Sequence, residues 1–144
     1  MKPIDELTGE VIDVAMRLHR DLGPGLLESV YEIVLAGQLE ALGYSVARQV
    51  PVPIEFQGHS FEVAFRIDLL VDNRLIVEIK SIEALTAAHS KQLLTYLRLT
   101  NQSVGLLINF AGATLKEGIR RVVNNYDPSA PSAPLRLCVN PIAE

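Results

Sequence analysis

The chain has no tryptophan, a single cysteine and few aromatic residues. Of its 144 residues 49% are hydrophobic but only 6% are aromatic, so we expect a core of aliphatic side chains. The lone Cys138 excludes an internal disulfide and favours a reducing compartment, so the cytoplasm is the expected location. No apolar run is long enough to span a bilayer and no charged and apolar leader opens the chain, so we expect no membrane partner.

Positive charge is also in short supply. The chain has 13 Lys and Arg against 17 Asp and Glu, which gives a net charge of −4 and a pI near 5.4. Proteins that bind duplexes usually carry a basic footprint, so this balance argues against tight sequence-independent binding of nucleic acid by the monomer. A homodimer would double the contact surface. A site whose carboxylates bind Mg²⁺ is not excluded, because the ion cancels much of their charge.

The spacing of apolar residues predicts an α/β protein. Residues recurring every three or four positions predict helices over 4–20, 26–42, 86–99 and 114–126. Alternation predicts strands over 44–56, 61–71 and 75–80, and a continuous apolar run predicts a buried strand over 104–109. Pro51 and Pro53 demote the first strand to an edge or bulged strand. The core candidates of the second helix are Leu27, Val30, Val34 and Leu42.

The order of these elements predicts a mixed sheet. The first three strands form an antiparallel meander, and the strand-helix-strand crossover over 75–109 makes the fourth strand parallel to the third. We expect a single domain over 1–126. Residues 127–144 are expected to be a Pro/Ser-rich linker and tail, with an edge strand possible over 135–139.

Two acidic residues and a lysine interrupt the apolar meander. Glu78 and Lys80 lie two residues apart and therefore project from one face of their strand. Asp68 joins that face only if the hairpin loop has the right parity. A two-residue loop would pair Asp68 with Val77, whereas a three-residue loop over 72–74 sets Asp68 opposite Glu78. We therefore predict a loop of three or five residues, or a bulge.

If assembled, these three residues suit hydrolysis of a phosphodiester. Asp68 and Glu78 would chelate Mg²⁺ or Mn²⁺ through oxygen, and their mutual repulsion should raise one pKa in the absence of metal. Lys80 would hold or deprotonate the attacking water and offset charge in the transition state. The alternative is an exposed ion pair between strand neighbours.

Two helices add polar residues to this picture. Gln92 and Tyr96 lie one turn apart on one helix face, where the amide could orient water or phosphate and the hydroxyl could contact the scissile backbone. Glu28 and Tyr31 share a face of the second helix, and Glu28 could be a third metal ligand. Alternatively, Gln92 is a surface residue, Tyr96 belongs to the core, and Glu28 only complements the helix dipole.

Several of these motifs resemble a known family. Gly25-Leu-Leu-Glu28-Ser-Val-Tyr31 resembles the signature of the GxxExxY protein family, a branch of the PD-(D/E)XK nuclease superfamily. The resemblance runs from about residue 14 to residue 125. It includes Arg66-Ile-Asp68-Leu-Leu-Val, Glu78-Ile-Lys80 and Gln92-Leu-Leu-Thr-Tyr96, which is similar to the Gln-x-x-x-Tyr element of RecB-like recombination nucleases.

The resemblance implies a restriction-endonuclease-like fold and metal-dependent cleavage of nucleic acid, with DNA favoured over RNA. It implies catalytic roles for Asp68, Glu78, Lys80 and Gln92, and metal ligation by Glu28, Asp68 and Glu78. We assign substrate binding to Tyr31, Arg66 and Tyr96. The alternative is an inactive module of the same fold that binds nucleic acid or a protein partner.

Overall fold

Five strands form one mixed sheet flanked by three α-helices in residues 2–125, the part of the chain that this computed structural model describes. The strands lie side by side in chain order. Strands β3 and β4 are parallel and all other neighbours are antiparallel. The elements are α1 (Ile4–Leu22), α2 (Glu28–Ala41), β1 (Val46–Phe56), β2 (His59–Val71), β3 (Leu75–Lys80), α3 (Ala87–Thr100), β4 (Val104–Asn109), the 3₁₀ turn η1 (Lys116–Gly118) and β5 (Ile119–Val123).

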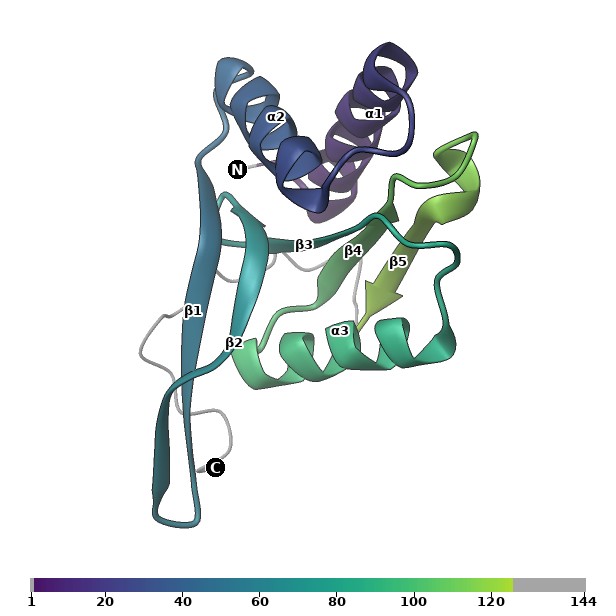
Figure 1. The fold of residues 1–144 in the computed structure, drawn as a ribbon. Coiled ribbons are helices and arrows are strands. Elements are labelled where there is room, and N and C mark those ends of the chain that lie inside the picture. The colour runs from purple at the N-terminus through teal and green to yellow at the C-terminus, as the bar shows by residue number, and fades with distance from the viewer. Residues whose placement is uncertain (1, 126–144) are drawn as a thin grey trace.

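Helices cover both faces of the sheet (Figure 1). Helices α1 and α2 lie over one face and α3 lies under the other. Successive residues of a strand point to opposite faces, so Val77 packs in a cluster with Val11 of α1, while Ile76 packs in a second cluster with Leu97 of α3. Strand β3 is therefore enclosed on both sides, and a charged residue within it is buried.

Strands β1 and β2 form a ribbon that extends beyond the rest of the sheet (Figure 1). Strand β2 has 13 residues, yet only Leu69–Val71 pair with β3. A two-residue turn at Gln57 and Gly58 closes the ribbon, and both residues have positive φ. That turn geometry matches the right-handed twist of the paired strands.

Strand β1 is an edge strand with two irregularities, as its prolines predicted. Its register with β2 shifts between Val52 and Ile54, around Pro53, which has no N–H to donate. Further along, Gln49 has a φ of 51° and no partner in β2, although Arg48 and Val50 on either side are paired. The register is the same on both sides, so Gln49 lies opposite Asp68 of β2, and its left-handed φ interrupts the regular pairing at this position.

The prediction of a helix over 114–126 is wrong for residues 114–125, the part of this range that the structure describes. The turn η1 and strand β5 take its place, with β5 antiparallel to β4. Ile119, Val122 and Val123 are β-branched and suit a strand. Gly118 lies so close to β4 that an added Cβ would overlap the carbonyl oxygen of Asn109. As in any strand, successive side chains of β5 point to opposite faces of the sheet.

Adjacent arginines of β5 show this alternation. Arg120 donates to the carbonyl oxygen of Thr86 and to Ser90, at the start of α3, at 3.0 and 3.1 Å. Arg121 instead pairs with Asp5 of α1, on the opposite face of the sheet. Strand β5 therefore ties both helical layers to its edge of the sheet.

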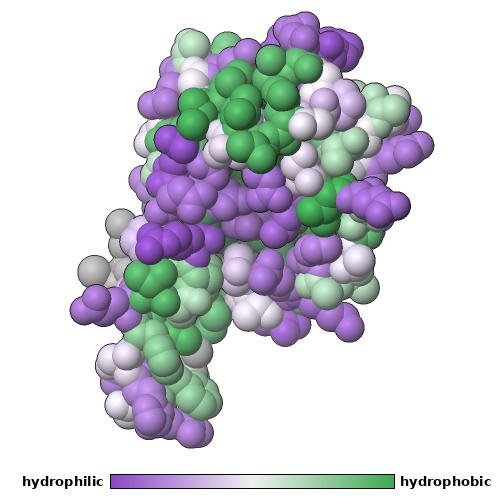
Figure 2. All heavy atoms as spheres, viewed as in Figure 1, coloured by the Kyte–Doolittle hydropathy of each residue, from purple (hydrophilic) through white to green (hydrophobic). Residues whose placement is uncertain are grey.

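The buried stripe of α2 also differs from the prediction. Tyr31, Leu35 and Leu39 face the core, and the predicted Val34 packs against it partly buried. Leu27 and Leu42, by contrast, are 75% and 57% exposed. The helix is apolar on most of its sides, so periodicity alone does not identify the buried one. Its exposed apolar side chains contribute to the apolar area at the top of Figure 2.

The predicted α/β class is confirmed, including the antiparallel meander and the parallel strand, and β5 adds one more strand. The single domain over 1–126 stays a prediction. The expected linker, the edge strand over 135–139 and Cys138 lie outside the described residues. None of the helices within 2–125 is both long and apolar enough to cross a bilayer.

Candidate active site

The candidate site lies where β2 and β3 separate. Val71 pairs with Leu75, so the hairpin loop has three residues, one of the predicted lengths, and the last backbone pair toward the site joins Leu69 to Val77. Continuing this register places Asp68 opposite Glu78. Beyond this point no backbone pairs join β2 and β3, and the two strands diverge. We call this point of divergence the fork; the side chains of Asp68 and Glu78 lie there.

Side chains replace the missing backbone bonds at the fork. The backbone N–H of Asp68 donates to Oε1 of Glu78 at 3.3 Å, and the backbone N–H of Ile79 donates to Oδ2 of Asp68 at 2.9 Å. Each carboxylate is therefore held by the strand opposite to its own. The prediction that Asp68 and Glu78 come together is confirmed in this geometry.

Electrostatics at the fork favour protonation of one acid. Glu78 is only 6% exposed, and burial together with the charge of Asp68 raises its pKa from 4.5 to about 8. The Asp68 backbone N–H and the charge of Lys80 act in the opposite direction but do not compensate. Without a cation, a proton is therefore held between the two acids at neutral pH.

Lys80 ends β3 on the same face as Glu78. Its side chain is partly buried, and none of the ion pairs found in residues 2–125 involves it. The amine is thus available beside two acids, where it can bind water or an anionic oxygen.

Glu28 begins α2 and reaches the same end of β3 from the other face. Its Oε2 accepts a hydrogen bond from the backbone N–H of Ser81 at 3.2 Å. A shallow pocket of about 410 Å³ opens there, lined by Leu26, Leu27, Glu28, Ser29 and Ser81. Within the described chain, however, no group of three or more acidic, histidine or cysteine side chains could hold a metal ion. The predicted ligand trio is therefore not assembled, whereas Asp68 and Glu78 are paired.

The helix α3 brings Tyr96 to the two acids. The Tyr96 ring stacks on Phe65 with centroids 4.0 Å apart. Burial first, and then the charges of Glu78 and Asp68, raise the pKa of Tyr96, so its hydroxyl stays protonated and can donate. Gln92 lies one turn earlier and is exposed, so its amide is accessible at the same side of the helix.

Two predicted substrate-binding residues behave differently. Tyr31 is fully buried and stacks on Phe110, and its hydroxyl donates to the carbonyl oxygen of Gly23 at 2.7 Å and accepts from the N–H of Leu26 at 3.1 Å. Both hydrogen-bonding roles of the hydroxyl are used internally, so the structure contradicts a direct contact of Tyr31 with substrate. Arg66 is exposed on β2, two residues before Asp68, and its role stays a prediction.

The structure also reveals three residues that the motifs did not single out. Glu32 is 5% exposed and pairs with Arg48 at 3.0 Å, and it also accepts from the amide of Gln49. That same amide reaches Oδ1 of Asp68 at 3.2 Å. The spacing of Glu32 from Glu28 is the one available signal, because residues four apart share a helix face.

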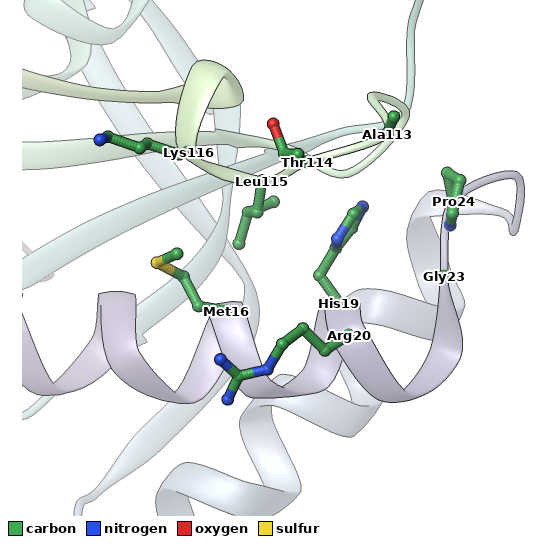
Figure 3. Close-up of a pocket in the computed structure, with 9 residues that line it drawn as sticks. All are labelled: Met16, His19, Arg20, Gly23, Pro24, Ala113, Thr114, Leu115 and Lys116. Carbon is green, nitrogen blue, oxygen red and sulfur yellow. The ribbon is translucent and has the colours of Figure 1, made fainter.

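His19 has a supporting role. Figure 3 shows its ring projecting from α1 toward the loop that carries Ala113 and Thr114, beside a pocket of about 340 Å³. Its Nε2 contacts the carbonyl oxygens of Phe110 and Gly112 at 3.2 and 3.0 Å, so this nitrogen carries the proton. His19 therefore ties the loop after β4 to α1.

Comparison with known proteins agrees with this arrangement. Residues 5–122 match the model of the PD-(D/E)XK nuclease superfamily. The chain belongs to this superfamily. Members of the PD-(D/E)XK superfamily are usually nucleases, and the observed sheet and its helices are consistent with their restriction-endonuclease-like fold. Membership in the GxxExxY family and in the RecB-like branch of the superfamily stays a prediction.

Two solved chains are similar to this one, and SSO0001 is among them. The crystal structure of SSO0001 is similar to this PD-(D/E)XK protein with 19% sequence identity and a TM-score of 0.46, over 84% of this chain and 61% of that one. The present chain thus spans less than two thirds of the length of SSO0001. No curated protein matches the sequence.

Proposed function

We propose that this protein is a metal-dependent nuclease that hydrolyses phosphodiester bonds in DNA. The observation that carries the proposal is the meeting of Asp68 and Glu78 at the fork, with the amine of Lys80 beside them. Membership in a superfamily of nucleases supports nucleic acid as the substrate. The similarity of Gln92 and Tyr96 to the Gln-x-x-x-Tyr element favours DNA over RNA.

The paired carboxylates fit a hard divalent cation. Mg²⁺ takes oxygen ligands, keeps several waters and is commonly held by only one or two protein carboxylates. Asp68 and Glu78 supply such a pair. Burial first, and then the charge of Asp68, raises the pKa of Glu78, so a cation bound there would favour its ionised form. Glu28, whose Oε2 accepts from the N–H of Ser81, would be a third ligand only if its side chain moved closer to the two acids.

The bound Mg²⁺ or Mn²⁺ would polarise the phosphate and make a nearby water more acidic. Lys80 would hold the attacking water by a hydrogen bond and offset the negative charge that develops on the phosphate oxygens. The protonated hydroxyl of Tyr96 would donate to a phosphate oxygen, and the exposed amide of Gln92 would orient the water or a neighbouring phosphate. Arg66 would contact the DNA backbone from β2.

Cleavage assays with matched variants test this proposal. Plasmid and single-stranded DNA would be incubated with the protein and Mg²⁺ or Mn²⁺, and compared with Lys80→Ala, Asp68→Ala and the exposed-lysine control Lys91→Ala. We expect a loss of at least about 100-fold in rate for the first two variants, the scale seen when a group that stabilises transition-state charge is removed. Lys91→Ala should cleave like the wild type. Equal rates for all four proteins would refute the assignment.

The acidic composition favours one alternative function. With a net charge of −4 and no preassembled group of three ligands in residues 2–125, the protein could instead be an inactive module that binds nucleic acid or a protein partner. Isothermal titration separates the two, because absence of Mg²⁺ and Mn²⁺ binding at millimolar concentration would favour the module. A homodimer would provide the nuclease with more DNA-contact surface, which analytical ultracentrifugation would test.

A further inference from the structure

We propose that Gln49, anchored by Glu32, is a positioning residue that orients the carboxylate of Asp68. The inference rests on the proposed function for its consequence in metal binding, but its geometric basis is independent of it. Gln49 does not touch Lys80 or Glu78 by any described hydrogen bond, so its influence on them passes through Asp68.

The amide nitrogen of Gln49 links the carboxylates of Glu32 and Asp68. Nε2 of Gln49 donates to Oε1 of Glu32 at 2.7 Å and to Oδ1 of Asp68 at 3.2 Å. Both partners are acceptors, so only the NH₂ end of the amide can face them. Oδ2 of Asp68 meanwhile accepts the backbone N–H of Ile79 at 2.9 Å. Each oxygen of Asp68 therefore has one donor, which fixes the rotation of the carboxylate.

Glu32 is a rigid support for that amide. It is 5% exposed, and its Oε2 accepts from both Nε and Nη2 of Arg48, at 3.1 and 3.0 Å. Because Arg48 compensates its charge through one oxygen, the other oxygen remains free for Gln49. Helix α2 is thereby connected through Glu32 and Gln49 to Asp68 of β2.

The backbone at Gln49 points to the same role. Its φ of 51° is in the left-handed region, which a long side chain rarely adopts within a strand. In the register of β1 with β2 Gln49 lies opposite Asp68, because Arg48 pairs with Leu69 and Val50 pairs with Ile67, and from this position its side chain reaches the Asp68 carboxylate. Such strained backbone is concentrated at functional sites, where the surrounding structure maintains it.

Metal binding measured by isothermal titration tests the proposal without relying on cleavage. In Gln49→Leu the side chain keeps its bulk but cannot donate, and we expect Mn²⁺ to bind 10- to 100-fold more weakly, as for other residues that orient metal ligands. Gln49→Gly should show the same loss although it relieves the left-handed φ. The matched control is Gln57→Gly, since Gln57 also has a left-handed φ, of 48°, but lies at the exposed ribbon turn.

The outcomes separate positioning from folding and from the proposed function. Wild-type affinity for Mn²⁺ in Gln49→Leu would overturn the positioning role. If the wild type itself binds no Mn²⁺, the proposed function fails, and amide hydrogen exchange then decides about Gln49. Without the hydrogen bond from Gln49, the Asp68 carboxylate should rotate and weaken its hydrogen bond to the Ile79 N–H. Amide exchange at Ile79 should therefore accelerate at least about tenfold in Gln49→Leu and not in Gln57→Gly. Unchanged exchange at Ile79 would equally overturn the proposal.

Discussion

Replacing Glu78 by glutamine should remove a pH-dependent penalty on folding. The carboxyl of Glu78 ionises with a pKa of about 8 in the folded protein, against 4.5 ordinarily. Between these values the folded state binds more protons than the unfolded state, so stability falls as pH rises through this window. Glutamine cannot ionise, yet its oxygen can still accept the Asp68 N–H and its amide can donate to the Asp68 carboxylate. The variant should therefore escape the loss.

The size of the effect follows from the width of the window. One pKa unit corresponds to about 1.4 kcal/mol. The shift from 4.5 to about 8 makes the wild type lose about 3 kcal/mol relative to Glu78→Gln between about pH 5.5 and pH 8.5. That is a large part of the 5–15 kcal/mol typical of a domain. The difference should level off above pH 8.5, where Glu78 is ionised in both states.

Urea unfolding at a series of pH values measures this difference. Far-ultraviolet circular dichroism is the suitable probe, because the chain has no tryptophan to report by fluorescence. Comparing the two proteins at each pH cancels the titration of all other groups. Glu62→Gln, at an exposed glutamate of the ribbon, should follow the wild type at every pH. A constant difference between Glu78→Gln and the wild type would refute the argument that Glu78 is buried beside a second acid.

Three further outcomes follow from the structure. Mg²⁺ affinity should rise about tenfold per pH unit from pH 6 to pH 8, because the cation must displace the proton of Glu78, and titration in buffers of different ionisation enthalpy would count that proton. Arg74→Met should keep or raise stability in thermal unfolding, because within residues 2–125 this buried arginine bonds only through Nη1, to the carbonyl oxygen of Lys2, while Nε and Nη2 have no partner there; a loss above about 2 kcal/mol would contradict this. Gly118→Ala should cost about 1–3 kcal/mol through overlap with β4, whereas Gly37→Ala, in an open helix position, should be neutral or stabilising.

The pairing of Asp68 with Glu78 could be predicted because it depends on parity. Side chains of a strand alternate, so an odd or even loop decides which residues share a face. A short hairpin with apolar residues on both sides leaves few registers, and the three-residue loop is one of those predicted. The position of Lys80 follows from the same alternation.

Other parts of the fold depend on contacts between distant residues. The strand β5 was mistaken for a helix because Leu115, Ile119 and Val122 have helical spacing, whereas the fit of Gly118 against β4 is a tertiary contact. The buried face of α2 was misplaced because the helix is apolar on most sides. Neither error can be corrected from local patterns.

The role of Gln49 was also out of reach of the motifs. Its side chain reaches Asp68 from the neighbouring strand and Glu32 from α2, and both are contacts between residues distant in sequence. Tyr31 illustrates the converse case. Its place in a recognisable motif suggested contact with substrate, whereas its hydroxyl holds the turn before α2.

The tip of the projecting ribbon should be less stable against local opening than the rest of the domain. Residues 53–64 are largely exposed, and within the described chain these end segments of β1 and β2 pair only with each other. A hairpin on its own is barely stable in water, so this tip should open and close many times for each unfolding of the whole domain. Coming from the tip, the core first contacts the ribbon at Val52 and Phe65. The next pair in the core, Val50 and Ile67, is one position from Gln49 and Asp68. Bending of the ribbon tip should therefore be transmitted along β2 to the segment that carries Asp68, the proposed metal ligand.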